Sequence, residues 1–443
     1  GYPYGYGASP AGMLDQRLQR TFPDRNVEVV TTAMSAVNTY TLLDFQGEIL
    51  EQQPDAVVIY AGHNEWVGLL GVGSGFTAGR RRPVVRTFLA VKDWRIFQLV
   101  RRAVRGLVPE PPRQDGDRTL MATIVAEKRI PLGSPLYERG LEQFRANLTD
   151  LLARYRRAGV PVWIGTLASN ERDQPPFVSG HRPGISQADM DAWSRHFEAG
   201  LRALASGDPE TALGELDRAL EIDDFPAEAH FRRGKALDAS SRFEEARQAY
   251  LTAKDHDELR FRAPEDVQAI LREVAAEQGA HLVEVRRAFL DEARDGIIGH
   301  DLMLEHLHPN LDGYFVLADA FYDALHADAV AVRSVRHEVL IDLGDGEGQA
   351  AVGGVLVGGP HLGDPVLEVV DDAACGGGHA AVEGVEDRGR LGRLEGHDDL
   401  ALRRARLDLQ EALGAGPVLA VVVRDPHELH ETVGELLGFL EGR

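Results

Sequence analysis

The chain has 443 residues, enough for two or three domains, and its 44% hydrophobic and 27% charged residues predict a packed core and argue against wholesale disorder. Its formal charge of −22 argues against general binding to nucleic acid, because phosphates would be repelled. A single cysteine, Cys375, excludes an intramolecular disulfide framework and any site built from several cysteines. No apolar run approaches the ~18 residues that span a bilayer.

Both ends of the chain are unusual. It begins GYPYGYGASP without an initiating Met, which we interpret as a processed or truncated start. From residue 335 onwards it holds 20 of the 47 glycines, with 21 acidic and 9 basic residues. Two interpretations of the stretch 335–443 stay open. One is an appended or disordered Gly-rich, acidic tail; the other, which we prefer, is a stretch read from the wrong frame of a GC-rich gene.

Upstream of this tail, helical and apolar segments alternate along the chain. Helices are expected from Ser9-Pro10 onwards and over 42–52, 141–157 and 265–278; strands are expected over 27–30, 56–60, 160–167 and 281–285. This order predicts an α/β fold with a doubly wound parallel sheet in a three-layer α/β/α arrangement. In such sheets chemistry lies beyond the carboxyl ends of the strands. We assign 1–187 and 259–330 to this domain.

A repeat interrupts the alternation over 188–258. Phe197, Gly200, Ala212 and Ala219 recur 34 residues later as Phe231, Gly234, Ala246 and Ala253. A 34-residue helix-turn-helix period with small residues at the helix crossings is the tetratricopeptide pattern. The functional interpretation is a concave surface for a peptide or protein partner. The alternative is that two units only cap the α/β domain, because such repeats need about three copies to stand alone. In either case we expect the pair to lean on the sheet.

The strand 56–60 is followed by a G-x-N motif. Gly62 permits a sharp turn, and the amide of Asn64 beyond a strand end can donate a hydrogen bond to a developing oxyanion. Alone, this motif is more often an ordinary turn.

A carboxylate and two histidines follow the last predicted strand. Glu305 precedes His308 by three residues in a bend stiffened by Pro309, so the carboxylate can orient the imidazole as a general base. The alternative is a metal site formed by Glu305, His306 and His308. Activity that is unchanged by a chelator would exclude the metal site.

The order of these elements and motifs resembles the SGNH/GDSL hydrolase family, specifically members with an inserted tetratricopeptide pair, over roughly residues 1–328. The resemblance implies that Gly62 and Asn64 form the third block of that family, with Asn64 as an oxyanion donor. It implies that His308 is the general base of the last block, with Glu305 in place of the usual Asp.

The other two family blocks depart from the pattern. Ala33 stands where the second block has a Gly whose N–H binds the oxyanion, and such a donor survives only if φ is negative. The Gly-x-Ser block with the nucleophile is missing. Ser9 is a candidate, but before Pro10 it is fully explained as a helix cap; Ser35 is a further candidate. We expect instead that the nucleophile and the central first strand precede Gly1, which leaves the chain as given inactive.

The segment 80–105 carries nine basic residues and one acid, Asp93, interleaved with large apolar side chains. One interpretation is an amphipathic helix on an anionic membrane surface near the active site. The other, which we favour here, is a lid helix with a solvated basic face.

The resemblance implies a bacterial serine esterase that hydrolyses carbohydrate- or lipid-type O-acyl esters by two-step acyl transfer, without a metal or organic cofactor. It also implies an extracytoplasmic or membrane-anchored location. The rival hypothesis is a non-catalytic scaffold in which a degenerate hydrolase domain displays the helical repeat to a protein partner. Ester hydrolysis lost on His308→Ala would favour the enzyme; peptide capture surviving that change would favour the scaffold.

Overall fold

The computed structural model describes residues 7–23, 25, 27–33, 36–68, 70–74, 81–107, 129–341 and 419–424. The chain divides into two compact units, one formed by 1–330 with 405–443 and the other by 331–404. The elements described below belong to the first unit, apart from the last turns of helix α13. No helix in the described ranges is both long and apolar enough to cross a membrane.

The described strands and helices alternate, apart from runs of consecutive helices. The strands are β1 (Glu28–Thr31), β2 (Ala56–Tyr60), β3 (Val162–Gly165), β4 (His281–Val283) and β5 (Leu419–Arg424). The helices are α1 (Pro10–Thr21), α2 (Thr39–Glu51), α3 (Arg82–Val91), α4 (Arg95–Leu107), α6 (Pro135–Arg157), α7 (Gln187–Ala205), α8 (Pro209–Ile222), α9 (Ala227–Ala239), α10 (Phe243–His256), α11 (Glu265–Gln278), α12 (Val285–Glu292), the 3-10 turn η2 (Arg294–Gly296) and α13 (Leu311–Ile341).

Local sequence explains where the best-predicted elements begin and end. Helix α1 starts at Pro10 because the Ser9 hydroxyl accepts a hydrogen bond from the N–H of Gly12, at 3.2 Å. Helix α11 matches the expected 265–278, and it stops at Gly279, whose φ of +68° suits glycine. Strand β2 also has the predicted bounds, and no residue in it is more than 7% exposed. A fully apolar run is what a strand covered on both faces requires.

The sheet is mixed, with the order β1-β5-β2-β3-β4. Strands β2, β3 and β4 are parallel, as expected for an α/β fold. Strand β5 belongs to the stretch 335–443, which the sequence predicts to lie outside the α/β domain. It lies between β1 and β2 and is antiparallel to both. Val422 pairs with Val30 on one side and with Val57 on the other. The expectation of a sheet with only parallel strands therefore holds for β2, β3 and β4 alone.

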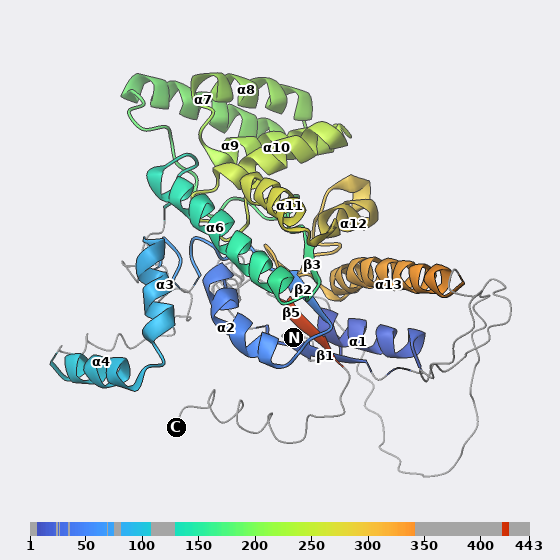
Figure 1. Cartoon of the computed structure of the whole chain (residues 1–443). Helices are drawn as coiled ribbons and strands as arrows, with labels where there is room; N and C mark the ends of the chain where they lie inside the picture. The colour runs from blue at the N-terminus through green and yellow to red at the C-terminus, as the bar shows by residue number, and fades with distance from the viewer. Residues whose placement is uncertain are drawn as a thin grey trace, which may run out of the picture. The chain divides into compact units, whose positions relative to one another are not determined.

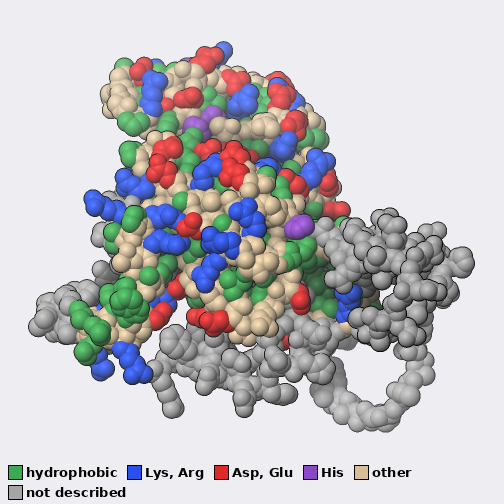
Figure 2. Space-filling view, in the orientation of Figure 1, with side chains coloured by type: hydrophobic (Ala, Val, Ile, Leu, Met, Phe, Trp, Pro, Cys, Tyr) green, Lys and Arg blue, Asp and Glu red, His purple; other side chains and the backbone are tan. Residues whose placement is uncertain are grey.

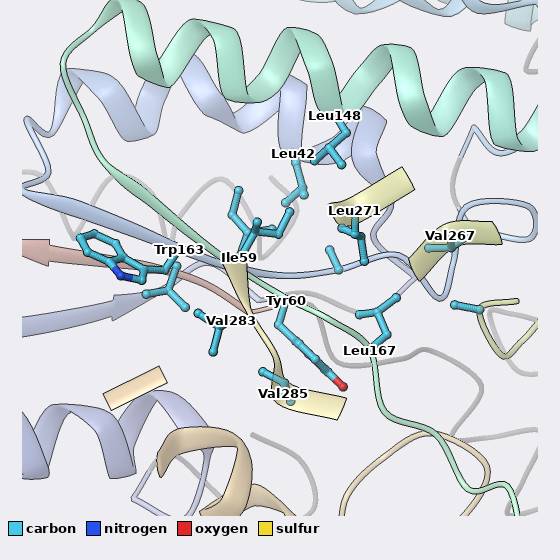
Figure 3. Packing of buried hydrophobic residues seen from close by; sticks show 14 of the residues in the cluster. Leu42, Ile59, Tyr60, Leu148, Trp163, Leu167, Val267, Leu271, Val283 and Val285 are labelled. Atoms are coloured by element: carbon cyan, nitrogen blue, oxygen red, sulfur yellow. The ribbon is translucent and has the colours of Figure 1, made fainter. Parts of the chain in front are cut away.

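Helices cover both faces of this sheet (Figure 1). On one face, the Gln46 side chain of α2 donates to the Leu151 carbonyl of α6, at 2.7 Å. On the other, α1 and α13 meet through the hydroxyls of Thr21 and Tyr322, 2.9 Å apart. The side chains between the layers, among them Ile59, form one continuous cluster (Figure 3). Such close packing fixes the strand ends, and with them the loops that follow.

The basic segment predicted as one helix over 80–105 forms two helices, α3 and α4. The break falls at 92–94, where the Trp94 N–H donates to the Val91 carbonyl in a turn, at 3.0 Å. Helix α3 packs on the domain through Val85, which is fully buried against Tyr40 and Leu70.

The residues of the 34-residue repeat form two helical hairpins, α7–α8 and α9–α10. Its small residues lie where the helices cross: a Cβ at Gly200 would lie 2.7 Å from Leu216, and a Cβ at Gly234 would lie 2.6 Å from the Tyr250 ring. The four repeated alanines are buried as well: Ala212, Ala219, Ala246 and Ala253. The sequence period therefore reflects close contact between helices.

Candidate functional site

The loop after β2 turns sharply at Gly62. Its φ is +151°, and a Cβ there would lie 2.7 Å from Leu167 Cδ1 and 3.3 Å from Val267 Cγ1. Any larger residue would clash with these two side chains, one from the loop after β3 and one from α11. Glycine is thus required where the chain leaves the sheet.

Asn64 is buried two residues further along this loop. Its Nδ2 donates to the Val37 carbonyl, at 3.1 Å, which ties the loop after β2 to the loop after β1. An amide nitrogen has two N–H bonds, and the described residues account for one of them. The arrangement leaves Asn64 able to donate to an oxyanion, as the G-x-N motif predicts.

Glu305 holds the bend that carries both histidines. Its Oε1 accepts a hydrogen bond from the His308 N–H at 2.7 Å and also contacts His308 Nδ1, while its Oε2 accepts from the His306 N–H, at 2.7 Å. Burial alone would raise the pKa of Glu305, but the charges and hydrogen bonds of His306 and His308 hold it well below its usual range. The ionised carboxylate fixes the imidazole of His308 with Nδ1 towards Glu305. A proton on Nδ1 would leave Nε2 as the basic nitrogen, which is the tautomer that a general base needs.

His63 lies inside the G-x-N motif and ties the loop after β2 to the segment before α11. It is buried, and its Nδ1 accepts a hydrogen bond from the Ala263 N–H, at 3.1 Å. Burial, followed by the charges of Lys254, His306 and His308, lowers the pKa of His63 to about 3. The charges of His306 and His308 therefore act on the loop after β2, where His63 stays a neutral imidazole.

His306 is buried and faces the interior. Its ring packs against Phe177 and Phe261, with centroid distances of 5.1 and 5.7 Å, and its Nδ1 contacts Glu305. In the part of the chain that the structure describes, no group of three His, Cys, Asp or Glu side chains has the geometry to hold a metal ion. The alternative metal site at Glu305, His306 and His308 gains no support from this arrangement.

The candidate residues near the N-terminus lie in different settings. The N–H of Ala33 donates to Thr31 Oγ1 at 3.3 Å, and among the described residues of this loop Ala36 is left-handed, with φ of +60°. Ser9 is 4% exposed and caps α1, in agreement with its expected structural role. Ser35 lies outside the described residues.

The loop after β3 completes the site, and sequence reasoning did not single it out. The Asn170 N–H donates to the His306 carbonyl at 2.9 Å, and the Asn170 carbonyl accepts from Arg262 Nη1, also at 2.9 Å. The next residue, Glu171, is buried and pairs with Arg286 at 2.9 Å. A buried carboxylate of this kind needs a cation beside it. In the sequence, Asn170-Glu171 after the strand 160–167 was the available signal.

The helical repeat supports this same loop. Arg172 pairs with Asp238 of α9 at 2.5 Å, and Asp173 pairs with Lys235 of the same helix at 3.2 Å. Lys254 of α10 also contributes, because it pairs with Glu265 at 2.6 Å.

Glu265 links the repeat to the Glu171–Arg286 pair, since its second oxygen contacts Arg286 at 2.6 Å. Burial opposes its ionisation, but Lys254 and Arg286 together lower the pKa of Glu265 to about 2. A pocket of about 390 Å³ lies beside this network, lined in part by Arg247, Asp255 and His256.

Comparison with models of known protein families, with curated proteins and with solved structures finds no match to this chain.

Proposed function

We propose that the protein is an SGNH/GDSL-type serine esterase that hydrolyses O-acyl esters, with His308 as general base. The observation that carries the proposal is the contact of His308 Nδ1 with the ionised Glu305. The charge of His308 also acts on His63, the neighbour of Asn64, and the Asn64 amide keeps an N–H for an oxyanion. Acyl transfer requires a base oriented by a carboxylate and a donor for the oxyanion, and these residues supply both groups.

In the proposed mechanism, His308 takes the proton of a serine hydroxyl as that oxygen attacks the ester carbonyl. It then gives the proton to the leaving alcohol, and the acyl-enzyme is hydrolysed by water in a second round. Asn64 donates to the oxyanion in both steps. The N–H of Ala33 contributes only if it leaves Thr31 Oγ1 when substrate binds.

The nucleophile is the part of the proposal that needs a direct test. Ser9 is occupied as a helix cap, and we place the reacting serine in a Gly-x-Ser segment encoded before Gly1. The experiment compares this chain with a version extended by the upstream codons of its gene. Both are assayed with p-nitrophenyl acetate and labelled with a fluorophosphonate, and the labelled peptide is sequenced.

We expect the extended protein to hydrolyse the ester and to carry the label on an upstream serine. His308→Ala should lower its kcat/KM by about 10³-fold, since general-base catalysis contributes roughly 10²–10⁴. His281→Ala is the matched control, because His281 stacks on Trp163 at the start of β4, at the opposite end of the strand from the site loops. A label on Ser9 or Ser35 would reassign the nucleophile, and an inactive extended protein would overturn the proposal.

A second candidate function is a scaffold that binds a peptide or protein through the tetratricopeptide-like pair. The open pocket beside α10 favours it, because charged side chains line it. The ion pairs of Arg172 and Lys235 instead favour the alternative in which the repeat only supports the α/β domain. Peptide capture by the His308→Ala variant, without ester hydrolysis by the unaltered extended protein, would support the scaffold.

A further inference from the structure

Helix α4 and the residue before it expose several large apolar side chains. Trp94 is 64% exposed, Ile96 77%, Leu99 69% and Val100 54%. These four exposed apolar side chains lie within seven residues. Figure 2 shows hydrophobic side chains in green gathered with basic ones in blue over α3 and α4. Contiguous exposed apolar surface of this kind marks an interaction site more often than scattered single residues do.

The charges on α4 are separated from this apolar surface. Arg95, Gln98, Arg101 and Arg102 fall on one side of a helix with 3.6 residues per turn, and Ile96, Leu99 and Val100 fall on the other. The segment 80–105 has nine basic residues and one acid, although the whole chain carries −22. The surface therefore suits a partner that is anionic and apolar at once.

Helix α3 attaches this surface firmly to the α/β domain. Arg82 pairs with Asp150 of α6 at 2.6 Å, and Lys92 pairs with Asp44 of α2 at 3.3 Å. Helix α4 contacts α3 through the Phe97 and Phe88 rings, whose centroids are 6.0 Å apart. Among the described residues, nothing buries the outer side chains of α4, which projects from the domain (Figure 1).

We propose that α3 and α4 form a docking arm, residues 82–107, that binds the surface of an anionic phospholipid bilayer. The apolar side of α4 enters the boundary between headgroups and acyl chains, and the arginines contact lipid phosphates. An anionic lipid surface satisfies both observations, whereas a nucleic acid would leave the apolar side unused and a purely apolar protein groove would leave the arginines unpaired. The inference is independent of the proposed esterase activity.

Trp94 supplies a direct readout, because the chain has four tryptophans and the other three, Trp66, Trp163 and Trp193, are at most 7% exposed. We expect vesicles with about 30% phosphatidylglycerol in phosphatidylcholine to protect Trp94 from acrylamide and to shift its emission to shorter wavelength. Vesicles of phosphatidylcholine alone should bind at least about tenfold more weakly, since each basic residue near an anionic surface contributes a several-fold factor. Added salt should weaken binding in the same direction.

Two variants separate the contributions of the arm in a vesicle co-sedimentation assay. The double variant Ile96→Ser with Leu99→Ser, and the double variant Arg101→Glu with Arg102→Glu, should each lower the vesicle-bound fraction by at least about tenfold. The matched controls are Phe315→Ser, at a side chain 59% exposed on α13, and Arg195→Glu with Arg202→Glu on α7, which should bind as the unaltered protein does.

Three results would overturn the proposal. The first is absence of binding to the anionic vesicles, and the second is equal binding to neutral and anionic vesicles. The third is a lipid-free oligomer that Ile96→Ser with Leu99→Ser converts to monomer, because the apolar side of α4 would then contact a second copy of the chain.

Discussion

The carboxyl group of Glu65 is buried beside Asn64 and accepts hydrogen bonds from the N–H and the hydroxyl of Thr39, at 2.9 and 2.7 Å. Burial raises the pKa of Glu65 from 4.5 to about 7, although the two hydrogen bonds from Thr39 oppose the rise. The folded protein therefore holds a proton that the unfolded chain has already released between these values.

This shift predicts a pH-dependent stability that Glu65→Gln removes. The contribution of Glu65 is fully present below about pH 4.5 and is lost as the pH rises through about 7, because a folded-state pKa above the unfolded value favours the protonated form. The free energy of unfolding of the wild type minus that of the variant should fall by about 3 kcal/mol between pH 4.5 and 8. Urea unfolding at a series of pH values measures it.

The measured quantity is the difference in unfolding free energy between wild type and Glu65→Gln. The difference is needed because the lowered pKa of His63 makes stability change with pH in the opposite direction. Its depressed pKa contributes stability that is lost as the pH falls from about 6.5 towards 3, and this contribution cancels in the subtraction. Glu138→Gln, at an exposed position of α6, is the control and should leave the slope unchanged. A difference that stays flat with pH would mean that Glu65 ionises normally.

At the scale of elements, the helical repeat depends on glycines at its helix crossings. Gly234→Ala should destabilise the protein by about 1–3 kcal/mol, since its Cβ would press into the Tyr250 ring. Gly214→Ala is a matched control in α8, with nothing within 4 Å of its Cβ, and should stabilise by about 0.5–1 kcal/mol through helix propensity. The urea midpoints of the two variants measure both effects. Equal midpoints would show that the helices crossing at Gly234 leave room for a methyl group.

At the scale of the whole molecule, sequence patterns predict elements whose causes are local. The apolar run 56–60 and the helix between Pro264 and Gly279 have the predicted bounds, because burial on both faces and the flanking residues mark them. Features that depend on distant partners could not be predicted. The hydrogen bonds to Glu65 come from Thr39, 26 residues earlier. Strand β5 pairs with β1 and β2 from the far end of the chain.

The candidate site shows the same division. Glu305 and His308 were predictable because they lie three positions apart in one bend, and their contact is local. The ion pair of Arg172 with Asp238 could not be predicted, because Asp238 lies 66 residues away on a repeat that sequence alone treats as separate. Local motifs therefore identify the candidate residues, while the residues that position them come from the tertiary fold.

Strand β5 gives the most discriminating prediction, because it occupies the central position that the family resemblance assigns to a strand before Gly1. Val422→Pro removes an N–H from the interior of a strand paired on both sides, and should destabilise this chain by at least about 2 kcal/mol in urea unfolding. Leu419→Pro, at the first residue of the strand, is the control and should cost much less.

In the protein extended by its upstream codons, we predict that Val422→Pro changes the free energy of unfolding by less than about 0.5 kcal/mol. The reason is that the sheet has one place between β1 and β2, and a parallel strand leading into the nucleophile turn would displace the antiparallel β5 from it. An equal loss in both proteins would show that β5 belongs to the sheet of the longer protein and would remove the upstream strand from our proposal. No loss in either protein would show that the pairing of β5 contributes nothing to stability.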